Sequence, residues 1–84
     1  MSIQNKKKIF NIVKELGALE TVDESMKLKE DAGLDSLGMV MLLITLEEEF
    51  DISLSQSDMD PFALKTVGDI IGLTDKYEKE GRGD

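Results

Sequence analysis

Apolar residues recur at the spacing of a helix near both ends of the chain. Near the start, the pattern predicts a helix from Ile3 to Leu16, and Gly17 offers a stop. Near the end, Thr66 is a candidate cap for a last helix. The polar residues 80–84 follow it and are expected to form a disordered tail. The residues expected to face inward from the last helix are Val67, Ile70, Ile71 and Tyr77.

The clearest helical pattern lies in the middle of the chain. It begins at Asp35 or Ser36 and continues to Phe50, where Asp51 and the residues after it break the period. The positions expected to face the core are Leu42, Leu43, Leu46 and Phe50. This helix is the most clearly indicated element of the sequence.

The segments between these helices have no regular period. Residues 17–35 are predicted to form a long ordered loop, which is unusual in a compact domain unless the loop has a function. The pair Asp60-Pro61 predicts a short third helix from about Pro61 to Leu64. No strand-like alternation of any length is present. The sequence therefore predicts an all-α bundle of three long helices and one short helix, in a single domain spanning residues 1–84.

Composition and charge exclude several classes of protein. The chain of 84 residues has no cysteine and no histidine, so disulfides, a thiolate nucleophile, a Cys-type zinc site and the commonest general base are all missing. A net charge of −8 disfavours binding to nucleic acid or to an anionic membrane. The longest apolar run, Met39 to Ile44, is too short for membrane insertion, and no apolar signal-peptide core follows the start. We therefore expect a cytoplasmic, monomeric protein.

The most informative segment places a serine in the first turn of the middle helix, after a glycine-containing acidic loop. Backbone N–H groups at a helix start have no intrahelical partner, so a phosphate attached to Ser36 would lie at the positive end of the helix dipole. Gly33 allows the loop to turn, and Asp35 can cap the helix or orient nearby groups. The same residues also fit ordinary capping. The segment reads Asp31-Ala32-Gly33-Leu34-Asp35-Ser36-Leu37.

The residues that follow this serine extend the pattern along the whole middle helix. They run from Gly33-Leu34-Asp35-Ser36-Leu37 through Val40, Leu42, Leu43 and Leu46 to Glu47-Glu48-Glu49-Phe50-Asp51-Ile52. In this segment, and in length, acidity and order of elements, the chain closely resembles the acyl carrier proteins. The Met1 start and polar end favour a free-standing carrier over a domain excised from a larger synthase.

The resemblance implies a function and a cofactor. Ser36 would be modified by a phosphopantetheinyl transferase, which moves 4′-phosphopantetheine from coenzyme A, and Asp35 would position it for that enzyme. Acyl groups would then be carried as thioesters on the arm and delivered to acyl-loading ligases or transferases and to synthases. The pathway would be fatty acid, polyketide or specialised acyl or aminoacyl synthesis. The carrier itself would not be an enzyme.

A second apolar stripe of the middle helix suits docking to such partners. It is expected to lie beside the core face and to be rimmed by acids, including Glu47 and Glu48, that suit basic partner surfaces. The stripe consists of Leu37, Val40, Met41 and Ile44. The alternative is that the stripe belongs to the core and the acids form a solvated face. Many carriers of fatty acid synthesis have acids where this chain has Gly38 and Met41, which suggests a dedicated pathway.

Three other functions fit the sequence less well than a carrier does. A serine hydrolase elbow would need a glycine where Leu34 stands, and the chain has no histidine to act as base. A calcium loop would need a glycine at Ser36 and a glutamate at Leu42. No metal site is predicted. The remaining competitor is an acidic helical interaction module without a prosthetic group, and modification at Ser36 separates it from a carrier.

Overall fold

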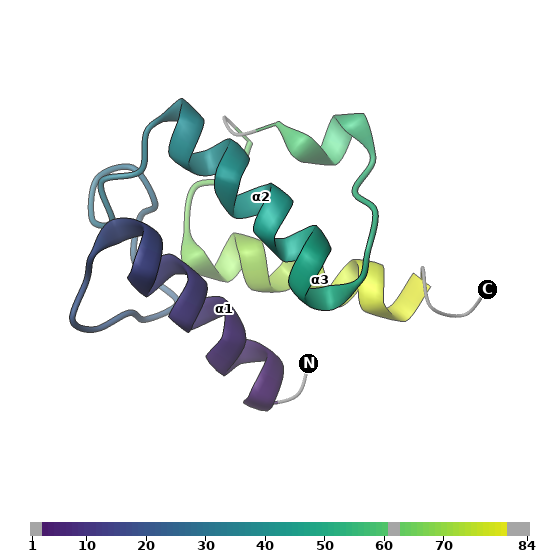
Figure 1. Ribbon diagram of the computed structural model, residues 1–84, viewed down its shortest axis with the longest axis horizontal. Coiled ribbons are helices and arrows are strands. Elements are labelled where there is room, and N and C mark those ends of the chain that lie inside the picture. The colour runs from purple at the N-terminus through teal and green to yellow at the C-terminus, as the bar shows by residue number, and fades with distance from the viewer. Residues whose placement is uncertain (1–2, 61–62, 81–84) are drawn as a thin grey trace.

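The computed structural model describes residues 3–60 and 63–80, which form three α-helices and one short 3₁₀ helix (Figure 1). The elements are α1 (Ile3–Gly17), α2 (Ser36–Phe50), η1 (Gln56–Met59) and α3 (Val67–Glu80). Apart from an isolated bridge between Lys27 and Thr66, these residues contain no β-structure. The predicted all-α bundle of three long helices and one short helix is confirmed. Over the same residues, no helix combines the length and apolarity needed to span a bilayer.

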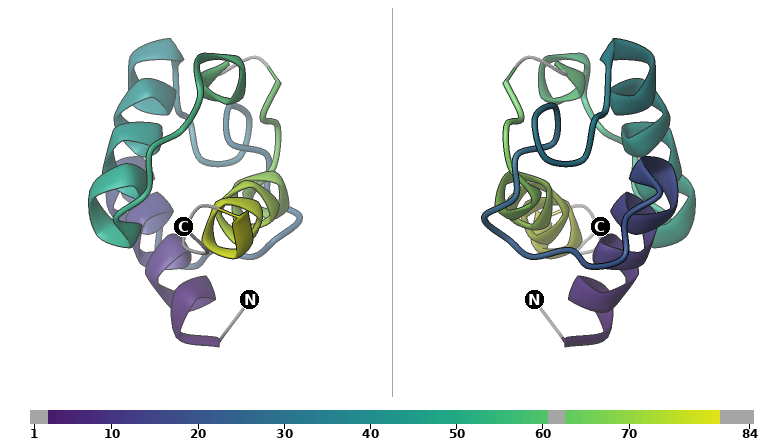
Figure 2. Two further views of the ribbon diagram at one scale, coloured as in Figure 1. Left: turned by 90° about the vertical axis from the view of Figure 1, so that its right-hand side faces the viewer. Right: turned by 90° about the vertical axis from the view of Figure 1, so that its left-hand side faces the viewer.

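The three long helices each contact the other two. Figure 2 shows α1 and α2 on one side of the molecule and α3 on the other. All four positions of α2 that were expected to face the core are buried, and Met39 joins them with no exposed surface. Burial of such side chains is the main favourable term in folding, so α2 contributes a large part of the core.

α1 ends one residue later than the periodicity predicts. Gly17 is the last helical residue, and Ala18 adopts the left-handed conformation with φ of 52°. The N–H of Ala18 donates to the carbonyl of Glu15 at 3.3 Å. Glycine was expected to supply the stop through its own backbone freedom, yet the left-handed residue is the alanine that follows it.

The loop between α1 and α2 closes over one end of the bundle, beside the start of α3 (Figure 1). No residue from 18 to 35 is helical, as predicted, and the loop buries Leu28, Ala32 and Leu34 in the core. Backbone hydrogen bonds of 2.8 to 3.0 Å join it to the start of α3, where amides have no intrahelical acceptor. They run from Leu28 N–H to Lys65 O, from Val67 N–H to Met26 O and from Gly68 N–H to Glu24 O.

α3 begins as the sequence predicts. The hydroxyl oxygen of Thr66 accepts a hydrogen bond from the Asp69 amide at 3.2 Å, which is the expected cap. Val67, Ile70 and Ile71 are buried, and Tyr77 is half-buried. The helix continues to Glu80, which the sequence places in a disordered tail; residues 81–84 lie outside the described residues.

The short helix lies earlier in the chain than predicted. It spans Gln56–Met59, whereas the sequence places it from about Pro61 to Leu64. The cap is Ser55, whose hydroxyl oxygen accepts from the amide of Asp58 at 3.4 Å. Residues 61 and 62 lie outside the described residues, and Ala63 and Leu64 are not helical. Ser55, six residues before the expected start, caps a helix earlier in the chain, so the prediction was wrong in position.

Candidate functional site

Ser36 is the first residue of α2, and its side chain is exposed. The first intrahelical bond runs from the Met39 N–H to the Asp35 carbonyl at 2.9 Å, so the amides of Ser36 and Leu37 precede it and have no intrahelical partner. The serine hydroxyl therefore stands at the positive end of the helix dipole. This geometry favours a serine-linked phosphate, because the helix dipole stabilises a negative charge there.

The side chain of Asp35 caps α2. Its backbone is extended, with φ of −89° and ψ of −171°, and its Oδ1 accepts a hydrogen bond from the Gly38 amide at 2.8 Å. A Cβ at position 38 would lie 3.3 Å from this oxygen, so a larger side chain would press on the cap. This contact is close, and the Asp35 side chain would have to shift by a few tenths of an ångström to relieve it. A role of Asp35 toward a transferase stays a prediction.

The loop holds Ser36 in place through the residues just before it. Gly33 adopts a left-handed conformation, with φ of 71°, which costs glycine little. Its neighbours Ala32 and Leu34 are buried, and the Leu34 amide donates to the Leu28 carbonyl at 2.9 Å. The chain is therefore anchored two residues before the serine, and Ser36 is presented from a fixed position.

An exposed apolar surface starts directly after the serine and follows α2. The fractions exposed are 69% for Leu37, 38% for Val40, 49% for Met41 and 45% for Ile44, and these are the exposed large hydrophobic side chains of residues 4–60 and 63–78. The expectation that the bundle leaves this stripe uncovered is confirmed, and the alternative that it is core is wrong. We call these four residues the exposed stripe. Its role in docking stays a prediction.

The charges of α2 are confined to its C-terminal end. Residues 36–46 carry no charged side chain, and the acids begin at Glu47. Glu48 is exposed, whereas Glu47 is half-buried and its Oε2 accepts a hydrogen bond from the Leu54 amide at 2.8 Å. The two predicted docking acids therefore differ in their surroundings.

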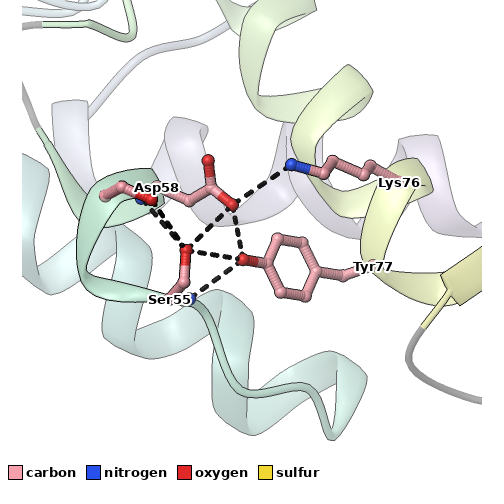
Figure 3. A network of polar contacts seen from close by, with 5 residues as sticks. Ser55, Asp58, Lys76 and Tyr77 are labelled. Atoms are coloured by element: carbon pink, nitrogen blue, oxygen red, sulfur yellow. Dashed lines mark hydrogen bonds and ion pairs between the residues drawn. The ribbon is translucent and has the colours of Figure 1, made fainter.

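A polar network that the sequence analysis missed joins α3 to the segment after α2 (Figure 3). The hydroxyl of Tyr77 donates to Asp58 Oδ2 at 2.5 Å and accepts from the Ser55 amide at 2.9 Å, and the Lys76 ammonium lies 3.3 Å from the same Asp58 oxygen. The tyrosine hydrogen bond is the chief reason why the pKa of Asp58 is lowered from its ordinary value. No local pattern signals the network, because its members come from two elements.

Comparison with known proteins shows which family the chain belongs to. Residues 7–74 match the family described as a phosphopantetheine attachment site. The acyl carrier protein of Chlamydia muridarum is 42% identical over 81 residues, covering 95% of this chain and 96% of that protein. That of Chlamydia felis is 40% identical over 72 residues, covering 84% and 88%. The chain belongs to the acyl carrier protein family.

The fold agrees with the family. The crystal structure of the acyl carrier protein from Thermotoga maritima superposes with a TM-score of 0.75 at 29% identity, covering 92% of this chain and 89% of that one. As an acyl carrier protein, the chain takes 4′-phosphopantetheine as its cofactor. An exposed serine hydroxyl at a helix start fits this group, because a phosphodiester formed there keeps its negative charge beside free amides and the helix dipole.

Proposed function

We propose that Ser36 bears the 4′-phosphopantetheine arm and that the protein carries acyl groups to partner enzymes without catalysing their reactions. The observation that carries this proposal is the exposed hydroxyl of Ser36 at the first position of α2, inside the segment that matches the attachment-site family. When attached, the arm supplies a terminal thiol on which acyl groups are held as thioesters. This accounts for a carrier whose chain has no cysteine.

The chain contributes the nucleophile and its surroundings. In the transfer, the Ser36 Oγ forms a bond to the phosphorus next to the pantetheine, the pyrophosphate bond of coenzyme A breaks, and adenosine 3′,5′-bisphosphate leaves. The hydroxyl proton passes to a base supplied by the transferase, because the carrier has no histidine. The α2 dipole stabilises the phosphodiester that results.

The exposed stripe is the surface that partners would recognise. It begins one residue after Ser36, so an enzyme that binds close to the attachment point lies beside it. Because residues 36–46 are uncharged, the partner surface opposite them is apolar, and basic groups are needed only opposite the C-terminal end of α2. This distribution supports a dedicated synthase or loading enzyme of a polyketide, aminoacyl or specialised acyl pathway.

Intact mass spectrometry tests the attachment. The protein is incubated with coenzyme A, magnesium and a promiscuous phosphopantetheinyl transferase, with Ser36→Ala as the control. We expect the wild type to gain one phosphopantetheine and the variant to gain none. A folded wild-type protein that gains nothing would instead support an acidic interaction module without a prosthetic group.

A further inference from the structure

Glu47 accepts hydrogen bonds from the start of the segment that follows α2. We call residues 51–60 the connecting segment. The backbone carbonyl of Glu47 accepts from the amide of Asp51, which caps α2 in a left-handed conformation, and from the amide of Ile52 at 3.1 Å. Its carboxylate accepts from the Leu54 amide at 2.8 Å, in a partly buried position. One residue thus holds three amides of the connecting segment.

Two consecutive amides of this segment are held by side chains from different helices. The Leu54 amide bonds to Glu47 on α2, and the Ser55 amide bonds to the Tyr77 hydroxyl on α3 at 2.9 Å (Figure 3). The side chains of Ile52 and Leu54 belong to the buried core, with 8% and 9% exposed. The Glu47 carboxylate therefore fixes the apolar part of the connecting segment against the core.

Glu48 has the opposite surroundings. Its side chain is exposed, and it lies four residues after Ile44 and seven after Met41, which places it on the same helix face as the exposed stripe. A basic group of a partner that covers the stripe can therefore reach Glu48. The carboxylate of Glu47 is less available to such a group, because its side chain is half-buried and its Oε2 already accepts a hydrogen bond from the Leu54 amide.

We propose that these adjacent acids have different roles: Glu48 is the charge that meets a docking partner, and Glu47 is a positioning residue that fixes the connecting segment. The part that concerns Glu48 rests on the carrier function proposed above, whereas the part that concerns Glu47 rests on the hydrogen bond alone. Of the two neighbouring carboxylates, a docking partner therefore pairs with that of Glu48.

Matched variants separate the two roles. Glu47→Gln removes the charge and keeps a carbonyl acceptor, Glu47→Ala removes both, and Glu48→Gln and Glu48→Ala repeat the changes at the exposed position. One readout is hydrogen exchange of the Leu54 amide by NMR. The other is kcat/KM of a promiscuous phosphopantetheinyl transferase for each variant as substrate, measured at low salt.

We expect the Leu54 amide to exchange about tenfold faster in Glu47→Ala, to return close to wild type in Glu47→Gln, and to be unchanged in both Glu48 variants. We expect kcat/KM to fall about threefold or more in Glu48→Gln and to change by less than about twofold in Glu47→Gln. An equal loss of kcat/KM in the two Gln variants, or unchanged Leu54 exchange in Glu47→Ala, would overturn the proposal. If Glu47→Ala does not fold, that loss of folding itself agrees with a structural role of Glu47, and kcat/KM of the two Gln variants still decides which acid meets the partner.

The two proposals fail separately. If the transferase modifies no variant and no wild-type protein, the carrier function fails, and with it the role of Glu48. The exchange of the Leu54 amide still decides whether Glu47 positions the connecting segment.

Discussion

Gly17 and Ala32 are in such close contact that a Cβ at position 17 would lie 2.7 Å from the Ala32 carbonyl oxygen. The last turn of α1 therefore packs directly on the backbone of the loop that leads to Ser36. Glycine is required here for the approach of another backbone, and the left-handed turn is taken by Ala18. The end of α1 and the position of the serine are thereby linked.

Substitution of Gly17 by alanine tests this contact. A backbone oxygen cannot move aside cheaply, so Gly17→Ala is expected to destabilise the fold by about 1–3 kcal/mol. The matched control is Gly72→Ala in α3, where a Cβ meets nothing within 4 Å and alanine is the better helix former. That variant should gain about 0.5–1 kcal/mol. Chemical denaturation measures both, and a stabilised Gly17→Ala would contradict the contact.

Asp35 is predicted to have a role in modification beyond its role as a cap. Asparagine is as good a cap as aspartate, so Asp35→Asn should leave the melting temperature nearly unchanged, whereas Asp35→Ala should cost about 1 kcal/mol. If the carboxylate also positions Ser36 for the transferase, Asp35→Asn will be modified more slowly. The rate of modification is measured by mass spectrometry over time. Equal rates for wild type and Asp35→Asn would show that Asp35 acts only as the helix cap.

Neighbouring positions of α2 separate docking from folding. Ile44 is 45% exposed, so Ile44→Asp is expected to lower turnover by partner enzymes severalfold while the circular-dichroism melt stays almost unchanged. Leu43 is fully buried, so Leu43→Asp should unfold the protein, because a charge without a partner is buried there. Met41→Glu serves as a second stripe variant. A large loss of stability in Ile44→Asp would assign that side chain to the core.

The Tyr77–Asp58 hydrogen bond makes part of the stability depend on acid pH. It lowers the pKa of Asp58, so its stabilisation is present above the ordinary carboxylate pKa and is lost as the pH falls through the lowered value. Tyr77→Phe should therefore raise the pKa of Asp58 and move the onset of acid unfolding to higher pH. An NMR titration of the Asp58 carboxyl carbon measures the pKa, and an unchanged value in Tyr77→Phe would exclude the tyrosine as the main cause.

The helices and the position of Ser36 could be predicted because they depend on neighbouring residues. The period of apolar positions gave the bounds of α1 and α2 to within one residue, and caps such as Asp35 and Thr66 act on amides three residues away. The short helix could not be located in this way. Three serines and two aspartates lie between residues 53 and 60, and each of them is an acceptable helix cap.

The roles of Glu47 and Gly17 depend on contacts that no local pattern encodes. Glu47 bonds to an amide seven residues later, across the turn at the end of α2, and in the sequence it cannot be told apart from Glu48. Gly17 matches the usual signal for a helix stop, yet its function is set by Ala32 in the folded loop. Residue type and spacing do not distinguish the roles of such acids and glycines. These roles depend on contacts that form only in the folded chain.

The backbone pairing between the loop and the start of α3 also has a consequence for the order of folding. Leu28 precedes α2 in the sequence and Lys65 follows it. The loop that presents Ser36 can therefore form this hydrogen bond only when the chain beyond α2 is available. Contacts between residues so far apart in sequence form late in folding. During synthesis they cannot form until the C-terminal part of the chain has left the ribosome. We therefore expect nascent or truncated chains to be poor substrates of the transferase, so that attachment of the arm marks a carrier whose folding is complete.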